Sequence, residues 1–262
     1  MPYVISYPRN WATFDLAPCG IEIADQHRFT ATRLDSRDVV DGLHRLDNAT
    51  FSDLGMRMPR WVLFDCGEFP GIVVGFGCRA GMLPDYVRQY YAVTENDDTF
   101  VPLSMWVAIR CAEDDAWFGH NLSSANIILR KADSLPGLAV LTKCFGVLVT
   151  RARTIYGATQ WDTTSIRIHQ KLGHMEVLSA YTPAHTHVNT FAYRTEIDAP
   201  AIRRQLENGF EQRSLPVTRS FAADDNENLL ALQRDIESGL RYRLAGIDRD
   251  ESGKRTVNLQ EI

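Results

Sequence analysis

Two stretches in the second half of the chain combine residue types that can bind a phosphate and move a proton. The first is the turn Ser134-Leu-Pro-Gly137-Leu-Ala139, which follows an apolar segment and leads into a predicted helix. Such a turn exposes backbone N–H groups beside the positive end of the helix dipole, and both attract phosphate oxygens. A Pro-Gly turn before an apolar helix is also an ordinary helix start, so both interpretations stay open for this turn alone.

The second stretch, residues 162–174, carries His169 and Lys171 on a predicted helix that ends at Gly173. Histidine exchanges protons near neutral pH, because its ordinary pKa is about 6.5. His169 can therefore act as an acid or a proton shuttle. The alternative is a helix histidine that only packs or bonds to the backbone.

Together the two stretches resemble the signatures of the GCN5-related N-acetyltransferase superfamily. Gly137 and Ala139 fit the last two anchors of its pyrophosphate loop, Q/R-x-x-G-x-G/A, with Ser134 in place of Gln or Arg. Residues 162–174 are similar to N-x-x-A-x-x-L-Y-x-K-x-G-F, with Asp162 in place of Asn and His169 in place of Tyr. The resemblance covers roughly residues 100–197, and the departures from both signatures mark a divergent member.

The resemblance implies an α/β fold, with a splayed mixed β-sheet flanked by helices and a C-terminal helical extension. It also implies an acyl-CoA-dependent N-acyltransferase, with acetyl-CoA or another acyl-CoA as donor and direct attack by an amine. His169 would protonate the departing thiolate, and backbone N–H groups near Val107 and Ile109 would stabilise the oxyanion. The implied acyl-CoA contacts are Val107, Ile109, Gly137, Leu138, Ala139, Val140 and Asp162.

His185 and His187 lie in a predicted loop between the last two strands of the resembled region. In the resembled family this loop lines the acceptor site, so both residues are acceptor-site candidates. A metal site that uses this pair with His120, His169 or His174 is the alternative. No H-E-x-x-H spacing or nearby carboxylate cluster favours it, so we expect no metal.

Two further functions stay open beside acetyl transfer. The segments outside the resembled region exceed a minimal acetyltransferase, and they could serve an acyl-carrier-protein donor or a macromolecular acceptor. The substitutions in both signatures are instead typical of a binding module that has lost catalysis. Fold alone does not decide among these functions.

Predicted helices and strands alternate around the two motifs, which indicates a layered α/β architecture. Residues 61–64 and 72–76 form a predicted hairpin, and residues 100–109 a predicted buried strand. The other predictions are helices at 37–54, 84–93, 135–153, 163–172, 201–213 and 226–244, and strands at 157–161, 176–181 and 189–197. We expect one acetyltransferase-like domain over residues 1–199, divergent in residues 1–60, and a helical extension over 200–262 packed on or near it.

Composition limits the partners. The 262 residues carry 28 basic and 33 acidic side chains, a net charge of −5, so no global basic field attracts nucleic acid or anionic lipid. Residues 134–172 reverse this balance, with five basic residues against Asp162 alone, which suits an anionic ligand or simply a solvated helix end.

The five cysteines form no C-x-x-C pair, and no long apolar segment is free of charge. We expect a cytoplasmic protein without a membrane span; a homodimer stays open.

Overall fold

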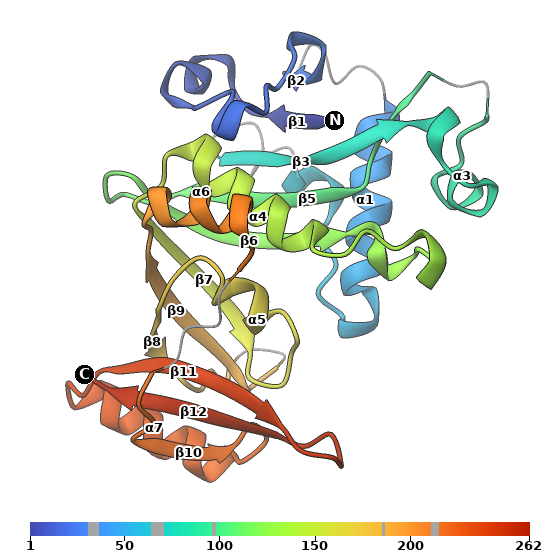
Figure 1. Ribbon diagram of the computed structural model, residues 1–262. Helices are drawn as coiled ribbons and strands as arrows, with labels where there is room; N and C mark the ends of the chain where they lie inside the picture. Colours follow the sequence, from blue (N-terminus) through green and yellow to red (C-terminus); the bar gives the residue numbers. More distant parts are fainter. Residues whose placement is uncertain (31–36, 64–70, 96–97, 185–186, 211–214) are drawn as a thin grey trace. The chain divides into compact units, whose positions relative to one another are not determined.

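A computed structural model describes residues 1–30, 37–63, 71–95, 98–184, 187–210 and 215–262 (Figure 1). Contacts divide the chain into two compact units, Met1–Ala152 and Arg153–Ile262. Each unit contains its own segment of β-sheet with helices packed on it. The predicted domain boundary between residues 199 and 200 is a different one from the boundary after Ala152, and it stays a prediction.

The first unit is built on a mixed sheet in the order β6-β5-β3-β1-β2, with β4 also paired to β3. Strands β1 and β2 are parallel, and the other pairs are antiparallel. Its main elements are β1 (Pro2–Ile5), β2 (Arg28–Phe29), α1 (Arg37–Phe51), β3 (Gly71–Arg79), α3 (Asp85–Tyr91), β4 (Phe100–Pro102), β5 (Ser104–Arg110), β6 (Ala116–Ser124) and α4 (Leu138–Thr150).

Helices α1 and α4 pack on opposite faces of this sheet. Side chains alternate between the faces along a strand. Met105 and Val107 of β5 share a buried cluster with α1 residues such as Leu43. Trp106, which lies between them in sequence, instead faces α4, where a side chain added at Gly146 would meet its ring. The sheet is therefore covered on both sides, which explains the apolar composition of β3 and β5.

Helix α4 is a core helix of the first unit. The longer segment Lys131–Thr150 is apolar enough by composition to cross a membrane. The α-helix itself has 13 residues, ten of them buried in the unit. At 1.5 Å per residue it spans about 20 Å, less than the roughly 30 Å of a bilayer core. Burial against β3, β5 and β6 accounts for its apolar composition.

The second unit is built on an antiparallel sheet in the order β10-β12-β11-β8-β9-β7. Trp161 stacks on Phe191 at 3.7 Å between ring centroids, and α7 adds Leu229 and Leu232 to the same core. Its elements are β7 (Thr154–Gln160), α5 (Ile166–His169), β8 (Met175–Ser179), β9 (Thr190–Glu196), α6 (Ala199–Asn208), β10 (Arg219–Ala222), α7 (Asn226–Glu237), β11 (Tyr242–Arg249) and β12 (Arg255–Glu261).

The α/β class and the mixed sheet flanked by helices are confirmed, and most predicted elements are present. Three predictions are wrong. Residues 61–63, predicted as a strand, are helical. The helix predicted over 163–172 is α-helical only at Ile166–His169. The C-terminal extension is not simply helical, because β10, β11 and β12 continue the sheet from β8. Charged residues alternate with apolar ones in this C-terminal segment. Val257 and Leu259 pair with residues of β10 and β11, so this part of the segment is a strand and not a helix.

Candidate active site

The loop between β6 and α4 is held in place by two side chains. Asn126 bonds Leu135 in both directions: its Nδ2 donates to the carbonyl and its Oδ1 accepts from the N–H, each at 2.7 Å. The Tyr86 hydroxyl donates to the Asp133 carboxylate at 2.7 Å and accepts from the Arg130 N–H at 3.0 Å. The backbone that leads into α4 is therefore preformed.

Gly137 turns this loop into α4. Its φ of +79° is in the left-handed region, which glycine adopts without strain, and an added Cβ would meet nothing within 4 Å. The hydrogen bonds of the helix begin with the Leu141 N–H, which donates to the Gly137 carbonyl at 2.8 Å. The first-turn N–H groups of Ala139 and Val140 have no acceptor inside a helix. They lie at the positive end of the helix dipole and can receive an anion.

A chain of three side chains joins α1 to β6. Asp47, which is fully buried, accepts from the Met58 N–H at 2.5 Å and from Asn121 Nδ2 at 2.7 Å. Asn121 Oδ1 lies 2.7 Å from His120 Nδ1. Burial raises the pKa of Asp47, and the bonds from Met58 and Asn121 oppose that rise. The buried carboxyl is thus linked through an amide to an imidazole on β6.

His120 occupies a β-bulge. The register between β5 and β6 passes from Val107 opposite Asn121 to Ala108 opposite Gly119, so His120 has no opposite residue in β5. A bulge redirects a side chain and is frequent beside active sites. Among the described residues, the contacts of the exposed imidazole are the bond to Asn121 and an edge-on approach to Phe118, at 6.3 Å between centroids.

Sequence reasoning missed this chain, because residues 117–121 match no known motif. The signal that could have found it is the polar pair His120-Asn121 inside a run of aromatic and β-forming residues. A polar pair of neighbours breaks strand alternation, as a bulge does. Asp47 gave no signal, since it is separated from Asn121 by 74 residues and meets it only in the fold.

The prediction that Val107 and Ile109 offer backbone donors to a ligand is corrected. Both lie on β5, which pairs with β3 on one side and β6 on the other across these residues. Backbone groups of a strand with two paired neighbours are used by the ladders. The last strand of the first unit's sheet before the turn into α4 is β6.

Asp162 and His169 belong to the second unit, whereas Gly137, Leu138, Ala139 and Val140 belong to the first. Asp162 is exposed in the turn after β7. His169, at the end of α5, is 8% exposed, and its ring lies 5.3 Å from that of Tyr193. The roles predicted for Asp162 and His169 stay predictions.

The acceptor-site candidates fall in the loop between β8 and β9. His185 lies outside the described residues, and His187 is partly buried near the start of β9. Within the described parts of the chain, no group of three or more His, Cys, Asp or Glu side chains is placed to hold a metal ion.

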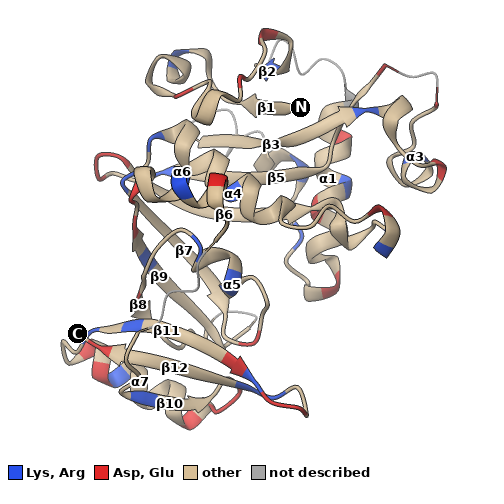
Figure 2. Ribbon diagram, in the orientation of Figure 1, with Lys and Arg blue, Asp and Glu red and all other residues tan. Residues whose placement is uncertain are grey.

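Figure 2 shows basic and acidic residues interspersed along both units. The five basic residues of 134–172 are divided between the two units. Lys143 is 1% exposed inside α4, so the interpretation that it neutralises a bound phosphate is wrong. Arg151 is the exposed left-handed cap of α4, a place where a cation favours the helix dipole. Arg167 and Lys171 lie in the second unit.

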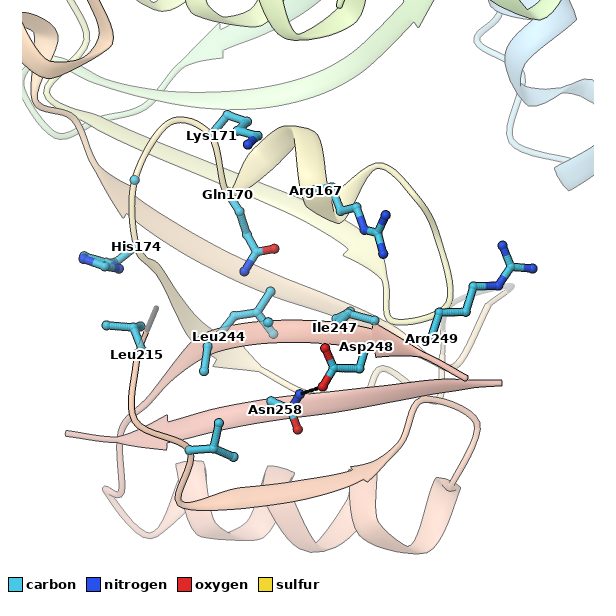
Figure 3. A pocket seen from close by; sticks show the side chains of 14 residues that line it. Arg167, Gln170, Lys171, His174, Leu215, Leu244, Ile247, Asp248, Arg249 and Asn258 are labelled. Carbon is cyan, nitrogen blue, oxygen red and sulfur yellow. Dashed lines mark hydrogen bonds between the residues drawn. The ribbon is translucent and has the colours of Figure 1, made fainter. Parts of the chain in front are cut away.

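Arg167 and Lys171 line a cleft of about 990 Å³ between α5 with its following turn and strands β11 and β12 (Figure 3). Arg249 supplies a third cation. The Asp248 carboxylate in the cleft accepts from Asn258 Nδ2 at 2.7 Å. This cleft lies wholly within the second unit and was not predicted from the sequence.

No family model and no curated protein matches the chain. Similar solved structures include the NatC complex bound to Gag peptide and CoA, with 10% identity, a TM-score of 0.42 and coverage of 63% of this chain and 94% of that one. Aminoglycoside 6'-acetyltransferase type Ii has 14% identity, a TM-score of 0.40 and coverage of 63% and 93%. The aminoglycoside 6'-N-acetyltransferase from Enterococcus faecium has 11% identity, a TM-score of 0.32 and coverage of 87% and 92%.

All three similarities have TM-scores below 0.5. At such identities and TM-scores they carry no activity, donor or acceptor over to this chain. The chemistry of this protein has to be argued from its own residues.

Proposed function

We propose that this protein is an N-acyltransferase that takes an acyl group from acyl-CoA and moves it to an amine by direct attack. The donor's pyrophosphate would lie at the turn around Gly137, against the N–H groups of Ala139 and Val140. That turn is preformed, exposed and free of side-chain obstruction, as an anion site requires.

The observation that favours catalysis over a binding-only module is the Asp47–Asn121–His120 chain. It ends on β6, the strand that leads into the same loop and helix. A fully buried carboxyl costs free energy unless hydrogen bonds satisfy it. Here those bonds orient a titratable group at a bulge. A side chain held in this way can take a proton from a substrate, which binding of CoA alone does not require.

Acyl-CoA binding is the first test. At 100 times its dissociation constant, a ligand adds about 2.7 kcal/mol to stability, so acetyl-CoA and CoA should raise the melting temperature of the full chain. Absence of a shift with any acyl-CoA would overturn the proposal and favour a carrier-protein donor.

A matched pair of variants locates the binding site. Ala139→Asp places a negative charge in the first turn of α4, which suits the helix dipole but repels a phosphate. We expect at least tenfold weaker CoA binding without loss of stability. Ala139→Asn, which has the same shape and no charge, should retain most of the affinity. Equal affinity for the two variants would place the pyrophosphate elsewhere.

The role implied for His169 has its own test. If His169 protonates the departing thiolate, His169→Phe should lower turnover of acetyl-CoA and leave its binding unchanged. Full turnover in His169→Phe would remove the residue from the reaction and leave it a packing role against Tyr193.

A further inference from the structure

We infer that His120 is the general base of the proposed acyl transfer, and that Asn121 and Asp47 position it by fixing its tautomer. The inference rests on the proposed function for the reaction itself. The tautomer follows from hydrogen bonds alone and can be tested without any substrate.

The donor and acceptor roles in the chain are determined from its buried end. The ionised Asp47 carboxylate can only accept, and one of its oxygens already takes the Met58 N–H. Asn121 must therefore present its NH2 group to Asp47 and its carbonyl oxygen to His120. An oxygen there requires a proton on His120 Nδ1. The neutral ring then carries its lone pair on Nε2.

Nε2 is available for chemistry. His120 is exposed, and in the described part of the chain no hydrogen-bond partner occupies Nε2. The bulge places the residue outside the β5–β6 ladder. Among the described residues, His44 of α1 also faces Asp47, and the charged form of either imidazole, His44 or His120, lowers the pKa of the carboxyl.

The reaction step balances as follows. Nε2 takes one proton from the acceptor ammonium, which leaves a neutral amine and an imidazolium. The amine nitrogen bonds to the thioester carbonyl carbon, the C–S bond breaks, and its electron pair leaves on sulfur. The second proton released from nitrogen goes to the thiolate. The imidazolium returns its proton to solvent, so the products are an amide, CoA and one proton.

The tautomer is tested with Asp47→Asn. The substituted amide keeps an oxygen for the Met58 N–H and turns its NH2 group toward Asn121, which must then rotate. Rotation presents the Asn121 NH2 group to His120 and reverses the ring to the Nε2–H tautomer. Nitrogen-15 NMR should show the Nδ1–H form in the parent and the Nε2–H form in the variant. The same tautomer in both proteins would overturn the positioning role.

The base is tested with two acceptors and acetyl-CoA. Butylamine is protonated at neutral pH and needs a base, whereas hydroxylamine is already unprotonated. His120→Gln should lower the rate with butylamine by about 100-fold, the usual effect of a general base, and leave hydroxylamine much less affected. The butylamine rate of the variant should recover at high pH. Equal effects on both acceptors, or no effect, would overturn the assignment.

Failure of the proposed function would look different. If neither the parent nor the variants bind acetyl-CoA or turn it over, the acyl-transfer proposal fails, and with it the role of base. The tautomer measured by NMR would still decide whether Asp47 positions His120. If acetyl-CoA binds and His120→Gln keeps its butylamine rate, only the base assignment fails.

A second inference rests on a different observation, the cleft in the second unit. We propose that it binds a small amphiphilic anion, an aliphatic chain that ends in a carboxylate. Its lining has three cations against one carboxylate, and that carboxylate is already bonded to Asn258. Among the described residues, the Arg167 side chain has no ion-pair or hydrogen-bond partner. Partly exposed apolar side chains, Leu215, Val217 and Ile247, supply the surface for a chain.

Gly246 allows the cleft to be filled without disturbing the fold. It lines the cleft, a Cβ added there would meet nothing within 4 Å, and its φ lies outside the left-handed region. Gly246→Leu should therefore project a side chain into the cleft. The matched change Arg167→Ala with Lys171→Ala removes two of its charges without filling it.

Binding is measured on the full chain with octanoate as the probe, and with octanol and inorganic phosphate in parallel. We expect octanoate to bind, octanol and phosphate to bind at least tenfold more weakly, and both variants to weaken octanoate at least tenfold. Equal binding of octanol and octanoate would show that the cations of the cleft do not contribute to binding. Preferred binding of phosphate would remove the role of the apolar surface. Unchanged octanoate binding in Gly246→Leu would place the probe outside the cleft.

Discussion

Lys143 is a titratable residue in the interior of the first unit. Its side chain is 1% exposed, and burial lowers its pKa to about 7 from an ordinary 10.5. Between these values the unfolded chain binds more protons than the folded one, so stability rises with pH across the window. The full pKa shift corresponds to a change in the free energy of unfolding on the order of a few kcal/mol.

We expect this rise to disappear in Lys143→Met. The free energy of unfolding in urea is measured at pH 7, 8.5 and 10 for the parent and the variant. The difference between their slopes against pH is the contribution of Lys143. Lys131→Met, at an exposed lysine, should keep the parent's slope. Parallel slopes for the parent and Lys143→Met would show that Lys143 is charged in the folded protein.

At the level of elements, α4 can lie close to the sheet because it has a glycine where it crosses β5. A Cβ at Gly146 would lie 2.2 Å from Trp106 Cε3 and 2.7 Å from Val74 Cγ1. Alanine favours a helix over glycine by about 1 kcal/mol, whereas overpacking a core costs about 1–3 kcal/mol. Because neither a tryptophan ring nor a strand can yield by an ångström, the clash should prevail.

Gly146→Ala is therefore expected to lower the free energy of unfolding by about 1–2 kcal/mol, measured by urea denaturation. Gly246→Ala, where an added Cβ meets nothing, is the control and should change stability by less than about 0.5 kcal/mol. A stabilised Gly146→Ala variant would mean that α4 is free to move away from the sheet.

At the level of the whole molecule, each unit has a hydrophobic core of its own. Leu46 lies in the core of the first unit and Leu232 in that of the second, both fully buried. Truncation of a buried leucine to alanine costs about 2–5 kcal/mol. We expect Leu232→Ala to raise hydrogen exchange in α7 and β10–β12, and Leu46→Ala to raise it in α1, β3 and β5.

Exchange measured by mass spectrometry with peptide resolution checks this. Protection lost equally throughout the chain in both variants would mean that the two units unfold only together. A two-state analysis would then describe the whole chain.

Local patterns in the sequence were sufficient for much of the fold. Apolar periodicity and end signals predicted α1, α3, α4, β8 and β9 close to their observed positions, because each depends on contacts between near neighbours in the chain. The C-terminal strands were missed for the opposite reason. Of these strands, β11 pairs with β8 across more than 60 residues of sequence, and β10 pairs with β12 across more than 30, although β11 and β12 themselves form a local hairpin.

The turn at Gly137 and its exposed N–H groups followed from the sequence alone, because a left-handed glycine before an apolar helix is a local feature. The Asp47–Asn121–His120 chain was decided only by the tertiary structure. Burial of Asp47 depends on the packing of α1 against the sheet, and the orientation of His120 depends on a bulge in the β5–β6 register. No short stretch of sequence contains either cause, so the residues with the clearest catalytic geometry are ones that no motif marked.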